Sequence, residues 1–257
     1  MIKRIHHVGV VVQSLQSAFT FWRDVLGLPL MREAELPDQG VRAALLACGP
    51  CEIELLELTA SDTGVARFLA SRGERLHHLC FESDDVGREL HRFLSTGVEL
   101  IDARPRKGLA GPIAFVHPRS CFGILVEMAT PIDHAPLLAA PLAVTTVHGM
   151  IEDVRAATSL YGDLFNLKLG LYHPDWSFAQ LAIAGVTLHL SSATRTSGKP
   201  GLSGLRLMAA DLGAFAARFD ERGVAYRRGA FGLALGSAAT HGVPLIIGQP
   251  QTQEVRA

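Results

Sequence analysis

The chain has 257 residues, 48% of them hydrophobic, with 24 Lys and Arg against 25 Asp and Glu and a formal net charge of −1. This describes a globular chain with core enough for one large or two ordinary domains, and it argues against nucleic acid or an anionic membrane as the main partner. The N-terminus lacks a signal peptide's apolar core, no stretch is long enough to span a bilayer and the four cysteines form no regular framework, so we expect a reduced, cytoplasmic protein.

The first element is a strand that opens at His6-His7 and continues through a run of Val and Gly to Val12. A helix is predicted over residues 15–26, because apolar residues recur there at helical spacing, and Gly27 ends it. Three further strands are predicted near residues 30–33, 43–47 and 52–58.

The string Cys48-Gly49-Pro50-Cys51 joins the last two of these strands. It looks like a thioredoxin-type redox motif, but that motif needs a strand before it and a helix after it. Here strands lie on both sides, and Gly-Pro between two strands is typical of a hairpin turn. We therefore predict a turn rather than a redox site.

A second unit of the same kind begins at His77-His78, again at the start of a short apolar run. Its helix is predicted over residues 86–95 and ends at Gly97. Imidazoles at the same end of two equivalent strands are a way for a repeat fold to build a metal site. The three strands of this unit are predicted near residues 99–103, 113–117 and 123–128.

The second half of the chain repeats the pattern, since residues 21–28 match residues 160–167 in their aromatic, Asp and Leu positions. Strands near 178–182, 185–191 and 205–209 and a helix over 212–222 follow. The Pro- and Ala-rich segment between the halves reads as a linker. We expect one domain over 1–130, the linker over 131–141, and a second domain over 142–257.

The first half contains four motifs, Ile5–Val10, Glu52–Glu57, Arg72–His78 and His117–Glu127. In this order and spacing, over about residues 2 to 130, they resemble methylmalonyl-CoA epimerase. The four units together resemble the wider vicinal oxygen chelate superfamily, and the second half resembles it only through its unit pattern. This resemblance implies an α+β fold of four βαβββ units in two tandem domains, with a metal inside a cupped sheet.

Neighbouring side chains of a strand point to opposite faces, so one His of each pair is expected to face the cup. Leu79 and Phe81 share a face with His77 and should pack under a helix, which leaves His78 facing the site. Alternation does not decide whether His6 or His7 faces the cup, because valines lie on both faces of that strand. The resemblance selects the second His of each pair, which gives His7 and His78.

Two carboxylates complete the expected ligand set. Glu127 lies in an apolar run, where a carboxylate costs several kcal/mol unless something pairs with it; the alternative is an exposed edge strand. Glu54 has Glu52 and Glu57 beside it and could belong to an amphipathic strand, but the resemblance assigns a ligand to its position. His7, Glu54, His78 and Glu127 suit one divalent Co, Ni, Mn, Fe or Zn ion.

The second half does not repeat this ligand set. Its strands place Thr146, His189, Gly204 and Ile246 opposite the four expected ligands. We therefore expect a degenerate second domain that acts as a structural lid or replaces the dimer partner of single-domain relatives. A homodimer of the whole chain stays open.

The resemblance implies proton abstraction alpha to a carbonyl, with Glu127 as one acid-base group and a metal stabilising the charge that develops. Some epimerases carry their second group as a glutamate after Gly-Val-x, but here Ala43 follows Gly40-Val41-Arg42. The true substrate can therefore differ from methylmalonyl-CoA. A glyoxalase-like lyase, an extradiol-type dioxygenase and a non-catalytic small-molecule-binding protein are the alternatives.

The expected partner is a small anionic molecule: a carboxylate, a keto acid or an acyl-CoA. Arg106, Lys107 and Arg119 flank the loop Gly108–Gly111 and are the candidates to hold its charge. The alternative is a solvated basic loop.

Overall fold

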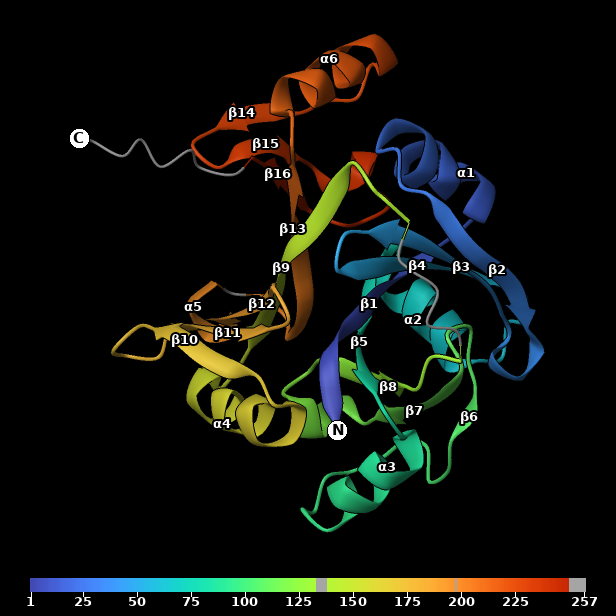
Figure 1. Cartoon of the computed structure of the whole chain (residues 1–257), viewed down its shortest axis with the longest axis vertical. Helices are drawn as coiled ribbons and strands as arrows, with labels where there is room; N and C mark the ends of the chain where they lie inside the picture. Colours follow the sequence, from blue (N-terminus) through green and yellow to red (C-terminus); the bar gives the residue numbers. More distant parts are fainter. Residues whose placement is uncertain (133–137, 197, 250–257) are drawn as a thin grey trace.

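The computed structural model describes residues 1–132, 138–196 and 198–249, which form two eight-stranded sheets (Figure 1). The first sheet has the strand order β2-β3-β4-β1-β5-β8-β7-β6. Its central strands, β1 (Ile2–Val12) and β5 (Arg75–Ser83), are antiparallel to each other, and each has a parallel outer neighbour, β4 or β8. The other strands are β2 (Leu30–Leu36), β3 (Val41–Cys48), β4 (Cys51–Leu58), β6 (Arg106–Lys107), β7 (Pro112–Val116) and β8 (Leu125–Ala129).

The second sheet repeats this topology in the order β10-β11-β12-β9-β13-β16-β15-β14, so the predicted α+β fold of two tandem units is confirmed. In the sequence, the predicted linker separates the strands of the first sheet from those of the second. Its residues 133–137 fall outside the described part of the chain, so the domain boundaries stay predictions. The strands are β9 (Leu142–Ile151), β10 (Lys168–Tyr172), β11 (Phe178–Ile183), β12 (Val186–Ser192), β13 (Gly201–Ala209), β14 (Arg227–Gly229), β15 (Gly232–Leu235) and β16 (Leu245–Gly248).

The main helices begin where a Ser or Asp side chain accepts a backbone N–H of the first turn. The caps are Ser14 for α1 (Leu15–Phe19), Asp85 for α3 (Val86–Leu94), Asp153 for α4 (Val154–Phe165) and Asp211 for α6 (Leu212–Arg222). The predicted first helix is divided, because α1 continues as a π-helix, η1 (Thr20–Val25). Helix α2 (Gly64–Arg72) was not predicted. The short helices are α5 (Ala193–Thr196), η2 (Pro37–Gln39), η3 (Pro118–Cys121) and η4 (Ser237–Ala239).

The strand predicted near residues 99–103 is wrong. Within this segment only Leu100 forms an isolated bridge, to Val116, and the first of the three strands after the helix is β6. The cause is Asp102, whose carboxylate accepts the backbone N–H of Phe115 at 2.9 Å and Nε of Arg106 at 3.0 Å. A side chain that binds the backbone in this way competes with a regular strand ladder.

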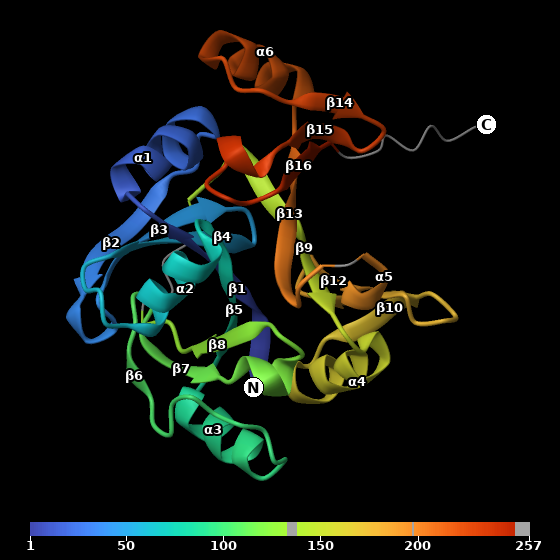
Figure 2. The same cartoon turned by 180° about the vertical axis from the view of Figure 1, so that it is seen from behind.

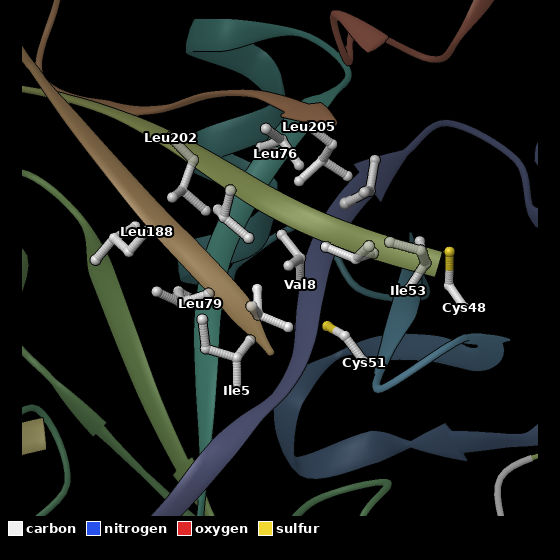
Figure 3. Close-up of a cluster of buried hydrophobic side chains, with 14 of the residues drawn as sticks. Ile5, Val8, Cys48, Cys51, Ile53, Leu76, Leu79, Leu188, Leu202 and Leu205 are labelled. Carbon is white, nitrogen blue, oxygen red and sulfur yellow. The ribbon is translucent and has the colours of Figure 1, made fainter. Parts of the chain in front are cut away.

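The backs of the two sheets share one hydrophobic core. In Figure 3, Val8 and Leu79 of the first sheet lie together with Leu188, Leu202 and Leu205 of the second. The contact extends to the helices, since the ring of Phe81 stacks on that of Phe165 at 4.7 Å and Tyr161 Oη donates to the carbonyl of Cys121 at 3.2 Å. The halves are therefore packed as one body.

The opposite face of the first sheet is concave and holds α2 within its curve (Figure 2). Phe68 and Leu69 of α2 pack on a separate buried cluster that includes Val11, Val41 and Leu56. This helix therefore covers the cup in which the metal site was expected.

The turn at Cys48-Gly49-Pro50-Cys51 is the predicted hairpin, with Cys48 paired to Cys51 and Gly49 at φ 71°. Both cysteines are free and buried. Burial raises the pKa of Cys48 to about 12, which disfavours a reactive thiolate.

Across the described residues, no helix is both long and apolar enough to cross a membrane.

Candidate metal centre

The four predicted ligands come together in the cup of the first sheet. Each of the four central strands supplies one: His7 from β1, Glu54 from β4, His78 from β5 and Glu127 from β8. His7 Nε2 lies 3.1 Å from His78 Nε2 and 3.5 Å from Glu54 Oε2, and His78 Nε2 lies 3.3 Å from an oxygen of each carboxylate. The four donor atoms all lie within 4.8 Å of one another.

All four side chains are buried, with relative exposures of 1% for His7 and His78, 5% for Glu54 and 4% for Glu127. Burial lowers the pKa of His7 well below its usual value, so this imidazole is neutral. Burial also opposes the charged form of His78, but the hydrogen bond that its ring donates to the Glu54 carboxylate and the charge of Glu127 leave its pKa raised. Burial, reinforced by the charge of Glu54, raises the pKa of Glu127 above its usual range.

This donor set fits a divalent transition metal. Two carboxylates and two imidazoles are buried together with no Arg or Lys among them, and the raised pKa of Glu127 shows that a second carboxylate charge is disfavoured there unless a cation stabilises it. Donors held about 2.1 Å from one ion lie roughly 3.0 to 3.4 Å apart, close to the separations found here. His6, His7 and Cys80 form another set within 4.8 Å, but burial raises the pKa of the Cys80 thiol, and the thiolate is the ligand form.

A glycine makes room for one of the ligands. Gly9 on β1 is paired with both Glu54 and His78, and a Cβ at Gly9 would overlap the His78 ring. The ring therefore lies directly on the backbone of the neighbouring strand.

The sequence argument that only one His of each pair faces the cup is wrong. Between β1 and β5 the register shifts at His6 and again at His77, so each of these residues is the extra residue of a β-bulge. The bulges break the strict alternation and turn both histidines of each pair toward the cup. His6 Nδ1 lies 2.8 Å from His7 Nδ1, and His77 Nδ1 lies 3.0 Å from His78 Nδ1. His77 does not pack under a helix on the back of the sheet, because its ring contacts Phe68 of α2.

A cavity of about 690 Å³ opens onto Glu54, His78 and Glu127. Its walls come from β2 to β4, from α2 and from the segment before β7. Most of the lining is apolar, with charged groups at intervals. The apolar residues include Leu36, Val41, Leu56, Phe68, Leu109 and Phe115, and the charged ones include Asp38, Asp62, Arg67, Asp102 and Arg106.

The structure separates the three predicted anion-binding residues. Arg106 lines the cavity, paired with Asp102 at 3.0 Å and with its guanidinium 5.2 Å from the Phe115 ring centroid. Lys107 is exposed and is not among the lining residues. Arg119 is 78% exposed in its side chain, near Glu99, and also lies outside the lining.

Sequence reasoning missed helix α2 and its contribution to the cavity. Thr63 caps this helix, and Val65, Phe68 and Leu69 follow at helical spacing, so an N-cap search of the segment after β4 was the available signal. Arg67 of the same helix is a further cation on the cavity wall.

The second sheet keeps the backbone of this site and loses its ligands. Its strand registers place Thr146, His189, Gly204 and Ile246 at the ligand positions, as expected from the sequence. His148 takes the place of Gly9, so the first half has Gly beside His and the second has His beside Gly. The rings of His148 and His189 lie 5.2 Å apart. Among the described residues of this half, no three metal-ligating groups converge.

Comparisons with known proteins find sequence similarity to this superfamily and to methylmalonyl-CoA epimerases in the first half of the chain. The model of the Glyoxalase/Bleomycin resistance protein/Dioxygenase superfamily matches residues 6–116. The mitochondrial methylmalonyl-CoA epimerase of Mus musculus is 32% identical over 127 residues, which are 49% of this chain and 71% of the mouse protein.

Solved structures extend the likeness to both halves. A methylmalonyl-CoA epimerase in complex with methylmalonyl-CoA and NH4+ is 32% identical, with a TM-score of 0.50 over 51% of this chain and 96% of its own. A triple variant of 4-hydroxymandelate synthase from Streptomyces coelicolor is 20% identical, with a TM-score of 0.69 over 89% of this chain and 77% of its own. The second likeness concerns the fold alone, and it covers both sheets.

Proposed function

The chain belongs to the glyoxalase/bleomycin resistance protein/dioxygenase (vicinal oxygen chelate) superfamily, and from this premise we propose that it is a divalent-metal-dependent enzyme that abstracts a proton alpha to a carbonyl. The observation that carries the proposal is the convergence of four buried donors, including two carboxylates, at the base of a cavity. His7, Glu54, His78 and Glu127 would hold one Co, Ni, Mn, Fe or Zn ion.

Each group at the site has a distinct part in such a reaction. The ion, when bound, supplies Lewis-acid stabilisation of the negative charge that develops on the substrate oxygen. Glu127 is the catalytic residue that takes the proton, because its carboxylate lies at the cavity wall among the ligands. Leu56 and Phe115 provide apolar surface in the same cavity, and Arg106 faces this cavity with a charge that suits an anionic group.

The second acid-base group expected of an epimerase is missing. Ala43 lies fully buried on β3, paired with Leu56 and surrounded by apolar side chains. Loss of a positioned acid-base group typically costs on the order of 10²- to 10⁴-fold in rate. We therefore propose proton exchange on one face of the alpha carbon, with isomerisation or elimination of a related substrate, and no efficient epimerisation of methylmalonyl-CoA.

The substrate class we propose is a small anion, either a carboxylate, a keto acid or an acyl-CoA. The complex of a related epimerase with methylmalonyl-CoA supports the acyl-CoA choice. We propose that the second half replaces a partner subunit, since its sheet shares a core with the back of the first. A dioxygenase site in the second half finds no support, because Thr146, Gly204 and Ile246 stand at three of the four ligand positions.

Metal analysis and a solvent-exchange assay test the proposal together. The purified protein, loaded with each candidate metal, should bind one ion per chain. It should incorporate deuterium from deuterated water into an alpha-carbonyl substrate drawn from a panel of acyl-CoAs and keto acids. The His78→Ala variant should lose both properties, whereas the matched control at the exposed His91 should keep them.

Equal metal content in the wild type and in His78→Ala would contradict the ligand set. One metal per chain without exchange on any panel member would leave a metalloprotein and contradict the reaction. Rapid racemisation of a single methylmalonyl-CoA epimer would show that another residue supplies the second proton.

A further inference from the structure

We propose that His6 and His77 are positioning residues, each of which fixes the tautomer and the ring orientation of the metal-ligating histidine that follows it. The proposal rests on the proposed function only in taking His7 and His78 as ligands. It assigns a task to the first member of each His-His pair.

The geometry at the two pairs is the same. His6 Nδ1 lies 2.8 Å from His7 Nδ1, and His77 Nδ1 lies 3.0 Å from His78 Nδ1. The rings in each pair meet edge to face, with interplanar angles of 82° and 83°. The Nε2 atoms of His7 and His78 point away from these contacts and toward each other at 3.1 Å. Each ligand imidazole therefore has one nitrogen on its neighbour and the other at the metal centre.

Hydrogen-bond chemistry then settles the direction of each contact. A neutral imidazole carries one hydrogen, and a nitrogen that binds a metal offers its lone pair. When Nε2 of His7 ligates the ion, the hydrogen of His7 is on Nδ1 and is donated to Nδ1 of His6. His6 must accept it, so its own hydrogen is on Nε2. The same assignment applies to His77 and His78.

Two β-bulges make these contacts possible. His6 and His77 are the extra residues where the register between β1 and β5 shifts, so each lies on the same side of the sheet as its neighbour. The second sheet has equivalent shifts at Thr145 and Ser203, which do not carry an imidazole. The bulge is thus a property of the fold, and the histidine in it is particular to the half that holds the ligands.

The surroundings of the two acceptor rings differ. The ring of His77 lies 4.6 Å from that of Phe68 on α2, so an element other than the strand of its ligand supports it, as expected of a group that orients a metal ligand. His6 is buried, and its Nδ1 also lies 3.1 Å from Glu52 Oε2, an acceptor that favours a hydrogen on that nitrogen. His6 is therefore the stricter case for the tautomer test.

Zinc affinity is the first test. Loss of an outer-shell partner typically weakens metal binding about 10- to 100-fold. We expect a loss of this size in the zinc dissociation constant, measured by chelator competition, for His6→Leu and for His77→Leu. Asn places a carbonyl oxygen near the position of Nδ1, so His6→Asn and His77→Asn should recover most of the affinity. Urea unfolding of the metal-free variants shows whether each one still folds.

The tautomers themselves are the second test, and this test needs no variant. In zinc-loaded protein labelled with ¹⁵N-histidine, we expect the hydrogens on Nδ1 of His7 and His78 and on Nε2 of His6 and His77. A hydrogen on Nδ1 of His6, or zinc on a nitrogen of His6, would overturn the proposal. So would unchanged zinc affinity in a folded His6→Leu and His77→Leu. Failure of the wild type to bind zinc would instead remove the metal centre and with it the proposed function.

Discussion

Gly9 is the residue on which the position of the His78 ring depends. A methyl group there would overlap that ring, so the ring would have to leave its place among the other ligands. We predict that Gly9→Ala lowers the free energy of unfolding by about 1–3 kcal/mol through overpacking, and reduces bound metal well below one per chain. Gly236→Ala is the control, because a Cβ at Gly236 meets nothing within 4 Å. Metal analysis and urea unfolding of both variants test these two effects. Full metal content in Gly9→Ala would contradict the prediction.

Ala43 is the residue that should limit inversion. We predict that Ala43→Glu raises inversion relative to one-sided exchange on methylmalonyl-CoA in deuterated water, because it places a carboxylate two residues from Leu45, which pairs with Glu54. Ala43→Gln is the matched control, since it has the same shape and cannot transfer a proton. Equal inversion by the two variants would show that the added carboxylate has no part in the reaction.

At this scale the sequence predicted which side chains meet and missed how they are held. Glu127 and His78 were found from apolar runs and alternation, and the four ligands do converge. The alternation argument failed at His6 and His77, because a bulge depends on the pairing of two strands and has no mark in either strand alone. Lys107 and Arg119 were grouped with Arg106 by sequence proximity, which does not show which side chains turn inward.

The strands of the second sheet carry a histidine pair whose titration should be visible. Burial, with His189 and Arg206 nearby, lowers the pKa of His148 to about 4. The unfolded chain takes up this proton near pH 6.5, and the folded chain takes it up only near pH 4. The free energy of unfolding should therefore fall as the pH drops through this window. We predict that His148→Asn reduces that fall, measured by urea unfolding at pH 7 and at pH 4.5.

The control for that experiment is His91→Asn, because His91 is exposed on α3. Its pH dependence should match that of the wild type. If His148→Asn behaves in the same way as this control, the burial of His148 does not contribute to acid sensitivity.

Elements with local signals were predicted well, and those that depend on tertiary contacts were not. Asp211 and Gly223 mark both ends of α6, and the predicted range 212–222 is the observed one. The segment near residues 99–103 reads as a strand, but Asp102 binds the backbone of β7 and displaces the pairing to β6. Helix α2 follows the last strand of the first unit, where the repeated strand-helix-strand-strand-strand pattern has no helix. A prediction based on that pattern therefore missed it.

The two halves should unfold together because they share a core and interlock at their loops. Gly242 of the second half lies against the backbone of Glu74, and a Cβ there would overlap the Glu74 carbonyl. His241 beside it contacts the Glu74 carboxylate at 3.1 Å. We predict that Gly242→Ala destabilises the whole molecule by about 1–3 kcal/mol more than a matched control, through overpacking against fixed backbone.

Gly223→Ala is the matched control, since Gly223 has a similar positive φ and open space around it. Both variants carry the same backbone strain, so the difference between them isolates the contact. Thermal unfolding should stay a single transition in the wild type. Equal destabilisation by the two variants would show that the junction at Glu74 adds nothing to the stability of the pair.

The reciprocal placement of glycine and histidine in the two sheets fixes the order in which a second site can arise. The ring of His78 occupies the space that a Cβ at Gly9 would need, and in the second sheet the Cβ of His148 already fills the equivalent space. A histidine at position 204 in the orientation of His78 would therefore collide with residue 148. For the second cup to gain a metal site like the first, glycine at 148 has to precede histidine at 204. Ligands added one by one while His148 remains would not produce such a site.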